Sequence, residues 1–340
     1  MSRIRVLSQQ DVLELMTIRD ALLADEKAYC QKASGAGSVW PMVFHEFEPG
    51  KADLDIKSGD LKESGVFGFK LVSWFGANPQ QDLPELFGTS MLFDIQSGKP
   101  MSVINAGALT GMRTGAAAAV GAKYLARPDA SSLLMVGTGM LAAYAIAAIL
   151  LVCPQIQSVS IANPHHPERA AEKLNHIKDQ VVQLLAECGE KRFVKFESAY
   201  NLAEASPKAH IIVTATPSRA PIILREWVMP GTHISCLGAD MAGKQELDSK
   251  ILVDASVFVD DIGQSVSVGE CEVAIKNNVI NEDQLSCEIG EVISGTHVGR
   301  RDNTEITVFD SSGIALQDLA CCSELLAKAV SLNKGALVDF

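Results

Sequence analysis

The sequence contains little that would direct it to a membrane, a secretory route or a nucleic acid. Its longest apolar run, Met140–Cys153, is too short to span a bilayer. The first residues, Met1-Ser2-Arg3-Ile4-Arg5, lead into no apolar stretch, so we predict no signal peptide. The net charge is −12 and the basic residues form no cluster, which argues against a nucleic-acid partner. We therefore expect a cytoplasmic protein with no nucleic-acid or membrane partner.

Cysteine is present but lacks the spacings that mark metal or redox sites. None of the eight cysteines belongs to a Cys-x-x-Cys pair, and none stands at zinc-ligand spacing with histidine, so we predict no metal site. Their scatter through apolar segments is typical of buried thiols in a reducing cytosol. The positions are Cys30, Cys153, Cys188, Cys236, Cys271, Cys287, Cys321 and Cys322.

The rest of the composition is that of a globular protein with room for two domains. Of 340 residues, 47% are hydrophobic and 21% charged, and there is no repeat or low-complexity tract. Ser8 is a plausible cap for a helix from Gln9 to about Lys32, followed by a loop over 33–38. Strand-like runs come next: Val39–Phe47, Asp53–Ile56, Val66–Trp74, Thr89–Asp94 and Pro100–Ile104, with turns at 48–50, 57–59, 76–79 and 96–98.

A different pattern begins with a helix predicted from about Thr110 to Leu125. Beyond it, apolar strands alternate with helices, which favours a parallel sheet covered on both faces. The strands expected there are Leu133–Val136, Ser158–Ala162, Ile211–Ala215, His233–Leu237, Val257–Val259 and Ile306–Phe309, with a long helix at Pro167–Cys188. A final helix, Ile314 to Ser331, follows the last strand and could return to the first domain.

One stretch within this pattern predicts a dinucleotide site. The apolar run Ser132–Val136 leads directly into a Gly-x-Gly-x-x-Ala turn and then into helix formers. Gly137 would make the turn, Gly139 would let phosphates approach the backbone, and Ala142 would let the helix pack close to the strand. The motif alone is weak, but its place between strand and helix favours NAD or NADP over an ordinary turn.

Three charged residues lie at positions where a catalytic or binding role would account for their charge. Lys70 lies among apolar strand residues, although it could simply face outward. Arg113 lies near the start of a helix of small residues, where a bound anion would account for a guanidinium; the alternative is a surface arginine. Asp240 follows a strand end, where a carboxylate can exchange a proton with an amine or water, or merely cap a helix or pair with Lys244.

The end of the second strand leaves the choice between NAD and NADP open. The acidic residue that usually binds the ribose is replaced by Asn163, which can still hydrogen-bond a ribose hydroxyl. His165 and His166 follow, and no arginine stands at the strand end itself, although Arg169 is close in sequence. Thr216 and Ser311 end two other strands and could contact the cofactor or cap turns.

Together these segments resemble the ornithine cyclodeaminase/mu-crystallin family over nearly the whole chain. The resemblance rests on several motifs in order, which are far more specific than the glycine loop alone. They are 109–117 (Leu-Thr-Gly-Met-Arg-Thr-Gly-Ala-Ala), 123–128 (Lys-Tyr-Leu-Ala-Arg-Pro), 136–139 (Val-Gly-Thr-Gly), 238–248 (Gly-Ala-Asp-Met-Ala-Gly-Lys-Gln-Glu-Leu-Asp) and 307–313 (Thr-Val-Phe-Asp-Ser-Ser-Gly).

The resemblance implies a fold, a cofactor and a homodimer. A substrate-binding and dimerisation domain of α/β type would comprise residues 1–118 with 315–340, and a Rossmann dinucleotide-binding domain with a parallel sheet residues 119–314. Family members move a hydride between nicotinamide and the Cα of an amino or imino acid. The main expectation is an ornithine cyclodeaminase-like enzyme that converts ornithine to proline with loss of ammonia. The alternatives are an amino-acid dehydrogenase or imine reductase, and a non-catalytic NADP-binding protein.

The family's functional residues can be carried over position by position. Lys70 and Arg113 match the residues that anchor substrate, Asp240 matches the catalytic acid/base, and Ser312 matches a position beside the substrate. Lys70 and Arg113 would also polarise the developing imine, and Arg113 is a candidate for cofactor binding as well. The positions implied for the cofactor are Thr89, Gly137, Gly139, Met140, Asn163, Thr216, Leu237, Gly238, Ala239, Lys244 and Ser311.

Two departures from the family pattern bear on the substrate. Met42 stands where the family usually has an arginine that helps to hold the substrate carboxylate. The segment Asp53–Gly59 also differs from the usual Met-Pro. Our hypothesis is that Lys57 supplies the missing charge and that Asp55 faces a substrate amine. These departures put ornithine itself in question and leave the cofactor assignment untouched.

Overall fold

The structure is a computed structural model that describes residues 3–340, which fall into two compact units. Unit 1 comprises the chain up to Arg113 together with Ile314–Phe340, and unit 2 comprises Thr114–Gly313. The C-terminal helix therefore returns to the first unit, as its position after the last strand suggests. The division falls inside α3 (Gly107–Leu125), a few residues before the 118/119 boundary expected from the family pattern.

Unit 1 is built on a mixed sheet in the order β18-β1-β7-β6-β5-β4-β2, with β3 paired to β4. Only β1 and β7 run parallel; the other neighbours are antiparallel. Its strands are β1 (Arg3–Leu7), β2 (Gly37–Val39), β3 (Val43–Glu48), β4 (Ala52–Leu61), β5 (Val66–Phe75), β6 (Leu86–Asp94), β7 (Pro100–Asn105) and β18 (Ala336–Asp339). Its helices are α1 (Gln9–Leu15), α2 (Ile18–Ala33), the short 3-10 helix η1 (Asn78–Gln81) and α11 (Ala315–Ser331).

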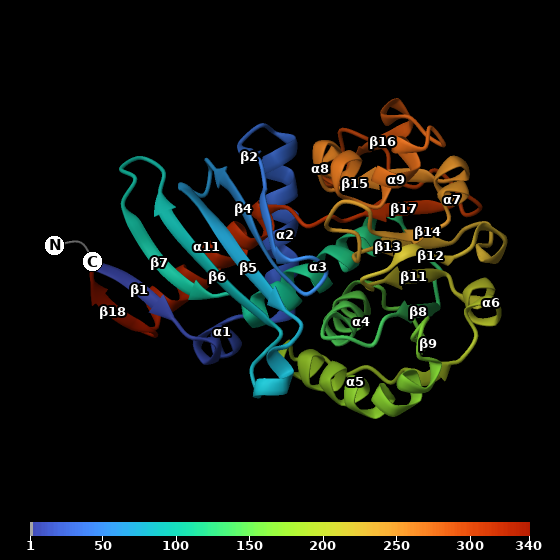
Figure 1. Cartoon of the computed structure of the whole chain (residues 1–340), viewed down its shortest axis with the longest axis horizontal. Helices are drawn as coiled ribbons and strands as arrows, with labels where there is room; N and C mark the ends of the chain where they lie inside the picture. Colours follow the sequence, from blue (N-terminus) through green and yellow to red (C-terminus); the bar gives the residue numbers. More distant parts are fainter. Residues whose placement is uncertain (1–2) are drawn as a thin grey trace. The chain divides into compact units, whose positions relative to one another are not determined.

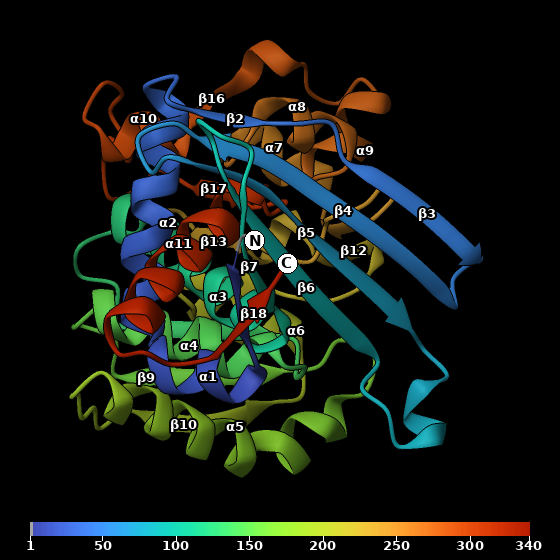
Figure 2. The ribbon, with the colours of Figure 1, turned by 90° about the vertical axis from the view of Figure 1, so that its left-hand side faces the viewer.

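Helix α11 packs on the face formed by β4, β5 and β6, and α2 packs on α11 (Figure 2). Two facing glycines make this close approach possible. A Cβ at Gly59 would lie 2.9 Å from the Leu316 side chain, and one at Gly68 would lie 3.1 Å from that of Leu319. The turn predicted at 57–59 is therefore wrong: Gly59 stays within β4 because it makes room for neighbouring chain, including the Ser38 carbonyl.

The single helix predicted from Gln9 to about Lys32 is also wrong, because the chain breaks at Met16 and starts again. Met16 is extended, and Thr17 caps α2 through a reciprocal capping box with Asp20. The Thr17 backbone N–H donates to the Asp20 carboxylate at 2.8 Å, and the Asp20 N–H donates to Thr17 Oγ1 at 3.2 Å. Such a box stabilises a new helix start more than continued helix would.

Unit 2 is a sheet of parallel strands in the order β10-β9-β8-β11-β13-β17-β15-β16, beside a small parallel pair, β12 and β14 (Figure 1). The strands are β8 (Ser132–Val136), β9 (Ser158–Ala162), β10 (Lys195–Ala199), β11 (Ile211–Thr214), β12 (Arg219–Ile223), β13 (His233–Cys236), β14 (Gln245–Leu247), β15 (Ser256–Val259), β16 (Leu285–Glu288) and β17 (Thr307–Asp310). The helices are α4 (Leu141–Val152), α5 (Pro167–Glu187), α6 (Leu202–Ala205), α7 (Ser249–Asp254), α8 (Ile262–Ser267), α9 (Cys271–Lys276) and α10 (Ile289–Ile293), with the 3-10 helices η2 (Ser206–Lys208), η3 (Arg225–Trp227) and η4 (Glu282–Gln284).

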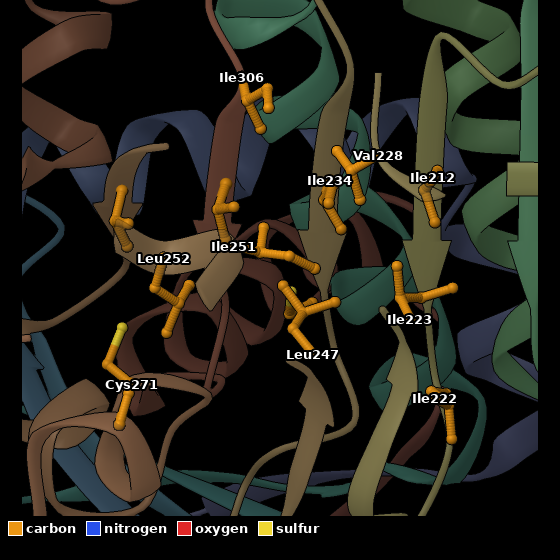
Figure 3. Close-up of a cluster of buried hydrophobic side chains, with 14 of the residues drawn as sticks. Ile212, Ile222, Ile223, Val228, Ile234, Leu247, Ile251, Leu252, Cys271 and Ile306 are labelled. Atoms are coloured by element: carbon orange, nitrogen blue, oxygen red, sulfur yellow. The ribbon is translucent and has the colours of Figure 1, made fainter. Parts of the chain in front are cut away.

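The strands of unit 2 read as continuous apolar runs because both faces of the sheet are buried. On one face, alternate residues such as Ile212 and Ile234 pack with β12, β14 and α7 in the core of Figure 3. On the other face the ring of Phe309 lies against α3, where a Cβ at Gly121 would be 2.6 Å from it. The predicted parallel sheet is thus confirmed. Among the described residues, no helix is long and apolar enough to cross a membrane.

The capping box predicts a measurable loss of stability. We expect Thr17→Ala to lower the free energy of unfolding by about 1 kcal/mol, since the first-turn N–H groups of α2 lose their side-chain acceptor. Urea unfolding followed by circular dichroism measures this. Lys27→Ala in the same helix removes only an exposed ion pair with Glu324 and is the control. Equal losses in the two variants would show that the box adds nothing.

Candidate functional site

Unit 1 gathers three cations on one face of its sheet. Lys57 and Lys70 are direct cross-strand neighbours on β4 and β5, and both are buried. Arg113, on α3, is 7% exposed. The outward-facing alternatives for Lys70 and Arg113 are therefore excluded, and the two residues meet at the same carboxylate.

That carboxylate is Asp318 on α11, which the sequence pattern did not single out. Lys70 Nζ donates to Asp318 Oδ1 at 3.0 Å and lies 2.9 Å from Oδ2, and Arg113 Nε lies 3.3 Å from Oδ1. Gln317, the preceding residue, donates to an Asp25 oxygen at 2.9 Å and to the Arg113 carbonyl at 3.4 Å. From the sequence alone, an aspartate in an amphipathic helix is expected to face solvent. Only the folded structure shows that Asp318 contacts Lys70 and Arg113.

Burial and the neighbouring charges shift the pKa values of the side chains in this cluster. Burial, and then the charge of Arg113, lower the pKa of Lys70 to about 8, although Asp318 acts in the opposite direction. Burial would raise the pKa of Asp318, but Arg113 and Lys70 more than offset it and hold that pKa below its usual value. Lys70 can therefore lose or regain a proton near neutral pH, while Asp318 stays ionised.

Asp55 adds an acceptor to the same face. It precedes Lys57 by two residues on β4, so both side chains point to one side of the sheet. Its Oδ1 atom is buried and has no hydrogen-bond partner among the described residues. A buried carboxylate oxygen without a donor is costly unless a ligand supplies one. Thr89 is exposed on β6 and Met42 is half-buried before β3; within residues 3–340 neither side chain is hydrogen-bonded to this cluster.

In unit 2 the expected cofactor residues follow strands at one edge of the sheet. The strand order reverses between β8 and β11, which is the usual position of a ligand crevice. Gly137 has φ +129°, and a Cβ there would lie 2.5 Å from the Ala215 carbonyl, so glycine is required. Gly139 has nothing within 4 Å of a built Cβ, and the neighbouring Met140 is exposed. The turn is open, as a loop that receives phosphates must be.

Asn163, which follows β9, is tied to this turn. Its Nδ2 donates to Thr138 Oγ1 at 2.9 Å. Its Oδ1 accepts from the backbone N–H groups of His165 and His166 at 3.2 and 2.9 Å. Asn163 therefore shapes the loop, while its second Nδ2 proton is left for another acceptor. The two imidazoles are exposed.

Thr216, Leu237, Gly238 and Ala239 follow β11 and β13, where a buried glutamate joins them. Glu246, on β14, accepts from Thr216 N–H and Oγ1, each at 2.7 Å, and from Gly238 N–H at 2.9 Å. Leu237 and Ala239 are buried beside it. Glu246 occurs in the family-like motif at 238–248, but nothing in its sequence position marked it as a residue that organises the loops.

The last strand of unit 2, β17, ends in a second loop held by a carboxylate. Asp260 accepts from Ser312 Oγ at 2.9 Å, from Gly313 N–H at 2.7 Å and from Ser311 Oγ at 3.4 Å. Burial, and then the neighbouring Asp310, raise the pKa of Asp260 to about 7. The loop that contains Ser311 and Ser312 is thus fixed by a group that titrates near neutrality.

Asp240 is paired with Lys244, one of the two alternatives that its sequence position left open. Its side chain is 46% exposed, while that of Lys244 is 15% exposed. Asp240 thus places a carboxylate, with a cation beside it, at the same edge of the sheet. Residues 3–340 contain no group of three His, Cys, Asp or Glu side chains that could hold a metal ion.

The raised pKa of Asp260 predicts a dependence of stability on pH. The folded protein keeps this proton up to about pH 7, whereas an unfolded aspartate loses it near pH 4, so stability falls as the pH rises between these values. Asp260→Asn cannot ionise and should lose less stability across that range, by roughly 1–4 kcal/mol.

Urea unfolding of both proteins at intervals from pH 4 to 8 measures the difference. The buried carboxyl groups of Glu270 and Glu246, whose pKa values are also raised, remain in both proteins and contribute the same slope to each. Parallel stability curves for the two proteins would contradict the assignment of this titration to Asp260.

A sequence model of the ornithine cyclodeaminase/mu-crystallin family matches residues 3–332. Iminosuccinate reductase of Paracoccus denitrificans is 34% identical over 324 residues, which are 95% of this chain and 96% of that protein. The match therefore spans both units rather than the dinucleotide fold alone.

Solved structures of similar proteins match this chain over nearly its whole length. An archaeal alanine dehydrogenase dimer with bound NAD is 34% identical, with a TM-score of 0.87 over 100% of both chains. Δ1-Pyrroline-2-carboxylate reductase of Thermococcus litoralis, in complex with NADH and L-proline, is 26% identical, with a TM-score of 0.89 over 98% of this chain and 100% of that one.

Proposed function

The chain belongs to the ornithine cyclodeaminase/mu-crystallin family, and from that premise we propose an NAD(P)-dependent dehydrogenase or imine reductase for a small amino or imino acid. The observation that carries the proposal is the buried cluster of Lys57, Lys70 and Arg113 in unit 1. Lys70 and Arg113 share the Asp318 carboxylate, and they carry more N–H donors than that carboxylate accepts, so donors remain for a substrate carboxylate. The similarity of named dehydrogenases and reductases over nearly the full chain supports the same reaction class.

The residues of unit 1 would bind and orient the substrate. Lys70 and Arg113 would hold its carboxylate, and Lys57 would take the place of the arginine that Met42 replaces. Lys70, with its pKa lowered to about 8, would also exchange a proton as the Cα–N bond changes order. The buried Oδ1 of Asp55 would accept a hydrogen bond from a substrate amine.

The loops of unit 2 fit a dinucleotide. The open turn at Gly139, the obligatory glycine at 137 and the fixed loops at Thr216, Gly238 and Ser311 suit a pyrophosphate and a nicotinamide. When bound, NAD(P) supplies or accepts the hydride at Cα. Asp240 would move a proton to or from the amine or water, with the Lys244 ammonium beside its carboxylate.

A cyclodeaminase is the second candidate, and Asp55 is the observation that favours it. A diamino acid carries a second amine, and an unpartnered buried carboxylate oxygen suits such a group. The two candidates differ in their products. A cyclodeaminase returns its cofactor to the starting state and releases ammonia, whereas a dehydrogenase or reductase changes NAD(P)H in step with its substrate.

A turnover panel with purified protein separates these candidates. Amino acids with NAD or NADP, and keto acids plus ammonia or methylamine with NADH or NADPH, are scored at the nicotinamide absorbance band. Ornithine and lysine are also scored for ammonia. We expect a stoichiometric change in NAD(P)H with one substrate. Ammonia without net NAD(P)H would indicate a cyclodeaminase, and nucleotide binding without any turnover would indicate a non-catalytic binding protein.

Lys57 provides the sharpest mutational test of the substrate site. With the substrate that the panel identifies, we expect Lys57→Ala to lower kcat/KM about 10- to 150-fold, mainly through KM, because a hydrogen bond to a charged group is lost. The exposed Lys62, just beyond β4, is the matched control, and Lys62→Ala should leave kcat/KM unchanged. Unchanged KM in Lys57→Ala would overturn the role given to this lysine.

A homodimer and a reducing compartment such as the cytosol complete the proposal. The edge strand β3 exposes Val43, Phe44 and Phe47, an apolar row of the kind that a partner chain covers. A similar structure is described as a dimer. None of the cysteines among residues 3–340 forms a disulfide, which suits a reducing compartment.

The interface proposal predicts a change of mass in solution. We expect Phe47→Glu to convert the dimer to monomer in sedimentation analysis, because a carboxylate would be buried against an apolar surface. Phe193, which is 99% exposed in unit 2, is the control, and Phe193→Glu should remain dimeric. A dimer that survives Phe47→Glu would place the interface elsewhere.

A further inference from the structure

Glu246 is a fully buried carboxylate to which the proposed chemistry gives no role. It lies on β14 and accepts four hydrogen bonds. The donors are Thr214 Oγ1, Thr216 N–H and Thr216 Oγ1, each at 2.7 Å, and Gly238 N–H at 2.9 Å. Hydrogen bonds from these four donors favour the charged form of the carboxylate and fix its position.

The donors belong to the ends of two neighbouring strands. Thr214 is the last residue of β11, Thr216 follows it, and Gly238 follows β13, which pairs with β11 in register. A Cβ at Gly238 would lie 2.5 Å from Glu246 Cδ and 2.2 Å from the Thr216 carbonyl. The absence of a side chain at 238 is therefore what lets the carboxylate reach both turns.

A second buried carboxyl group holds Glu246 in place. Glu270 accepts the backbone N–H groups of Glu246, at 3.0 Å, and Leu247, at 2.6 Å. Burial, and then the charge of Glu246, raise the pKa of Glu270 well above its usual value. Burial also raises the pKa of Glu246, but the hydroxyl and N–H donors of Thr214 and Thr216 counter that effect. Glu270 thereby anchors the backbone of β14 at the residue whose side chain joins the two turns.

We propose that Glu246 is a positioning residue for the nicotinamide half of the cofactor, acting through the turns after β11 and β13. The inference rests on the proposed dinucleotide function. In a doubly wound sheet the two halves of a dinucleotide bind on either side of the point where the strand order reverses. Here the glycine turn and Asn163 lie on the β8–β9 side, and the turns held by Glu246 lie on the β11–β13 side. Glu246 therefore holds only the turns on the β11–β13 side.

Binding of NADH and of ADP-ribose, which lacks the nicotinamide, tests this division. Glu246→Gln keeps the shape of the side chain. It replaces one oxygen acceptor with an amide N–H donor, which then faces groups that donate to Glu246 in the wild type. We expect its Kd for NADH to rise about tenfold or more, its Kd for ADP-ribose to stay as in the wild type, and its KM for the nucleotide to change more than its kcat. Thr214→Val, which removes one donor and keeps the volume, should show the same pattern with a smaller change.

The experiment distinguishes a failure of the positioning role from a failure of the dinucleotide function. If Glu246→Gln fails to fold, Thr214→Val carries the test alone. Wild-type affinity for NADH in the folded variants, or equal losses for NADH and ADP-ribose, would overturn the positioning role. A wild-type protein that binds ADP-ribose, NADH and NADPH no better than a control protein would instead overturn the dinucleotide function on which the inference rests.

Discussion

Unit 1 depends on one buried carboxylate, that of Asp318. Lys70 and Arg113 lie where water cannot solvate them, and buried charge is tolerated only when it is paired. Because Asp318 is on α11, the pairing also requires the C-terminal helix to pack on the sheet of unit 1. Gly59 and Gly68 allow that packing by leaving space for the helix side chains. Remove the carboxylate, and two uncompensated cations would remain in the core.

Unit 2 meets a similar constraint with backbone groups instead of cations. A parallel sheet brings the carboxyl ends of its strands to one edge, where the turns leave N–H groups without ladder partners. Glu246 and Asp260 accept those N–H groups from buried positions, and Glu270 accepts the N–H groups of Glu246 and Leu247 on β14. Their pKa values rise because burial disfavours the charged form. The loop after β17 is therefore held by a carboxyl group, that of Asp260, whose loss of a proton lowers stability as the pH rises towards 7.

The sequence predicted the family, the parallel sheet and most of its strands, because each depends on local order. The family is confirmed by a match over residues 3–332. Prediction failed where a distant segment decided the outcome. Gly59 is part of a strand because α11 needs the space. β1 and β18 went unpredicted because β1 pairs with the distant β7 and β18, and β18 pairs with the distant β1. The break at Thr17 had a local signal, the capping box with Asp20, which helical periodicity obscured.

The candidate site likewise has features that the sequence predicts and features that depend on contacts between distant segments. By itself the sequence determined the glycine turn at 137–139, since strand, turn and helix are contiguous, and it determined Lys70, Arg113 and Asp240 as unusual charges in patterned surroundings. Only the tertiary structure decided that Asp318 pairs with Lys70 and that Glu246 joins two strand ends, because these contacts span 248 and 32 residues of chain. Side-chain charge and spacing are local properties, whereas the burial that gives a charge its partner and its pKa exists only after the chain has folded.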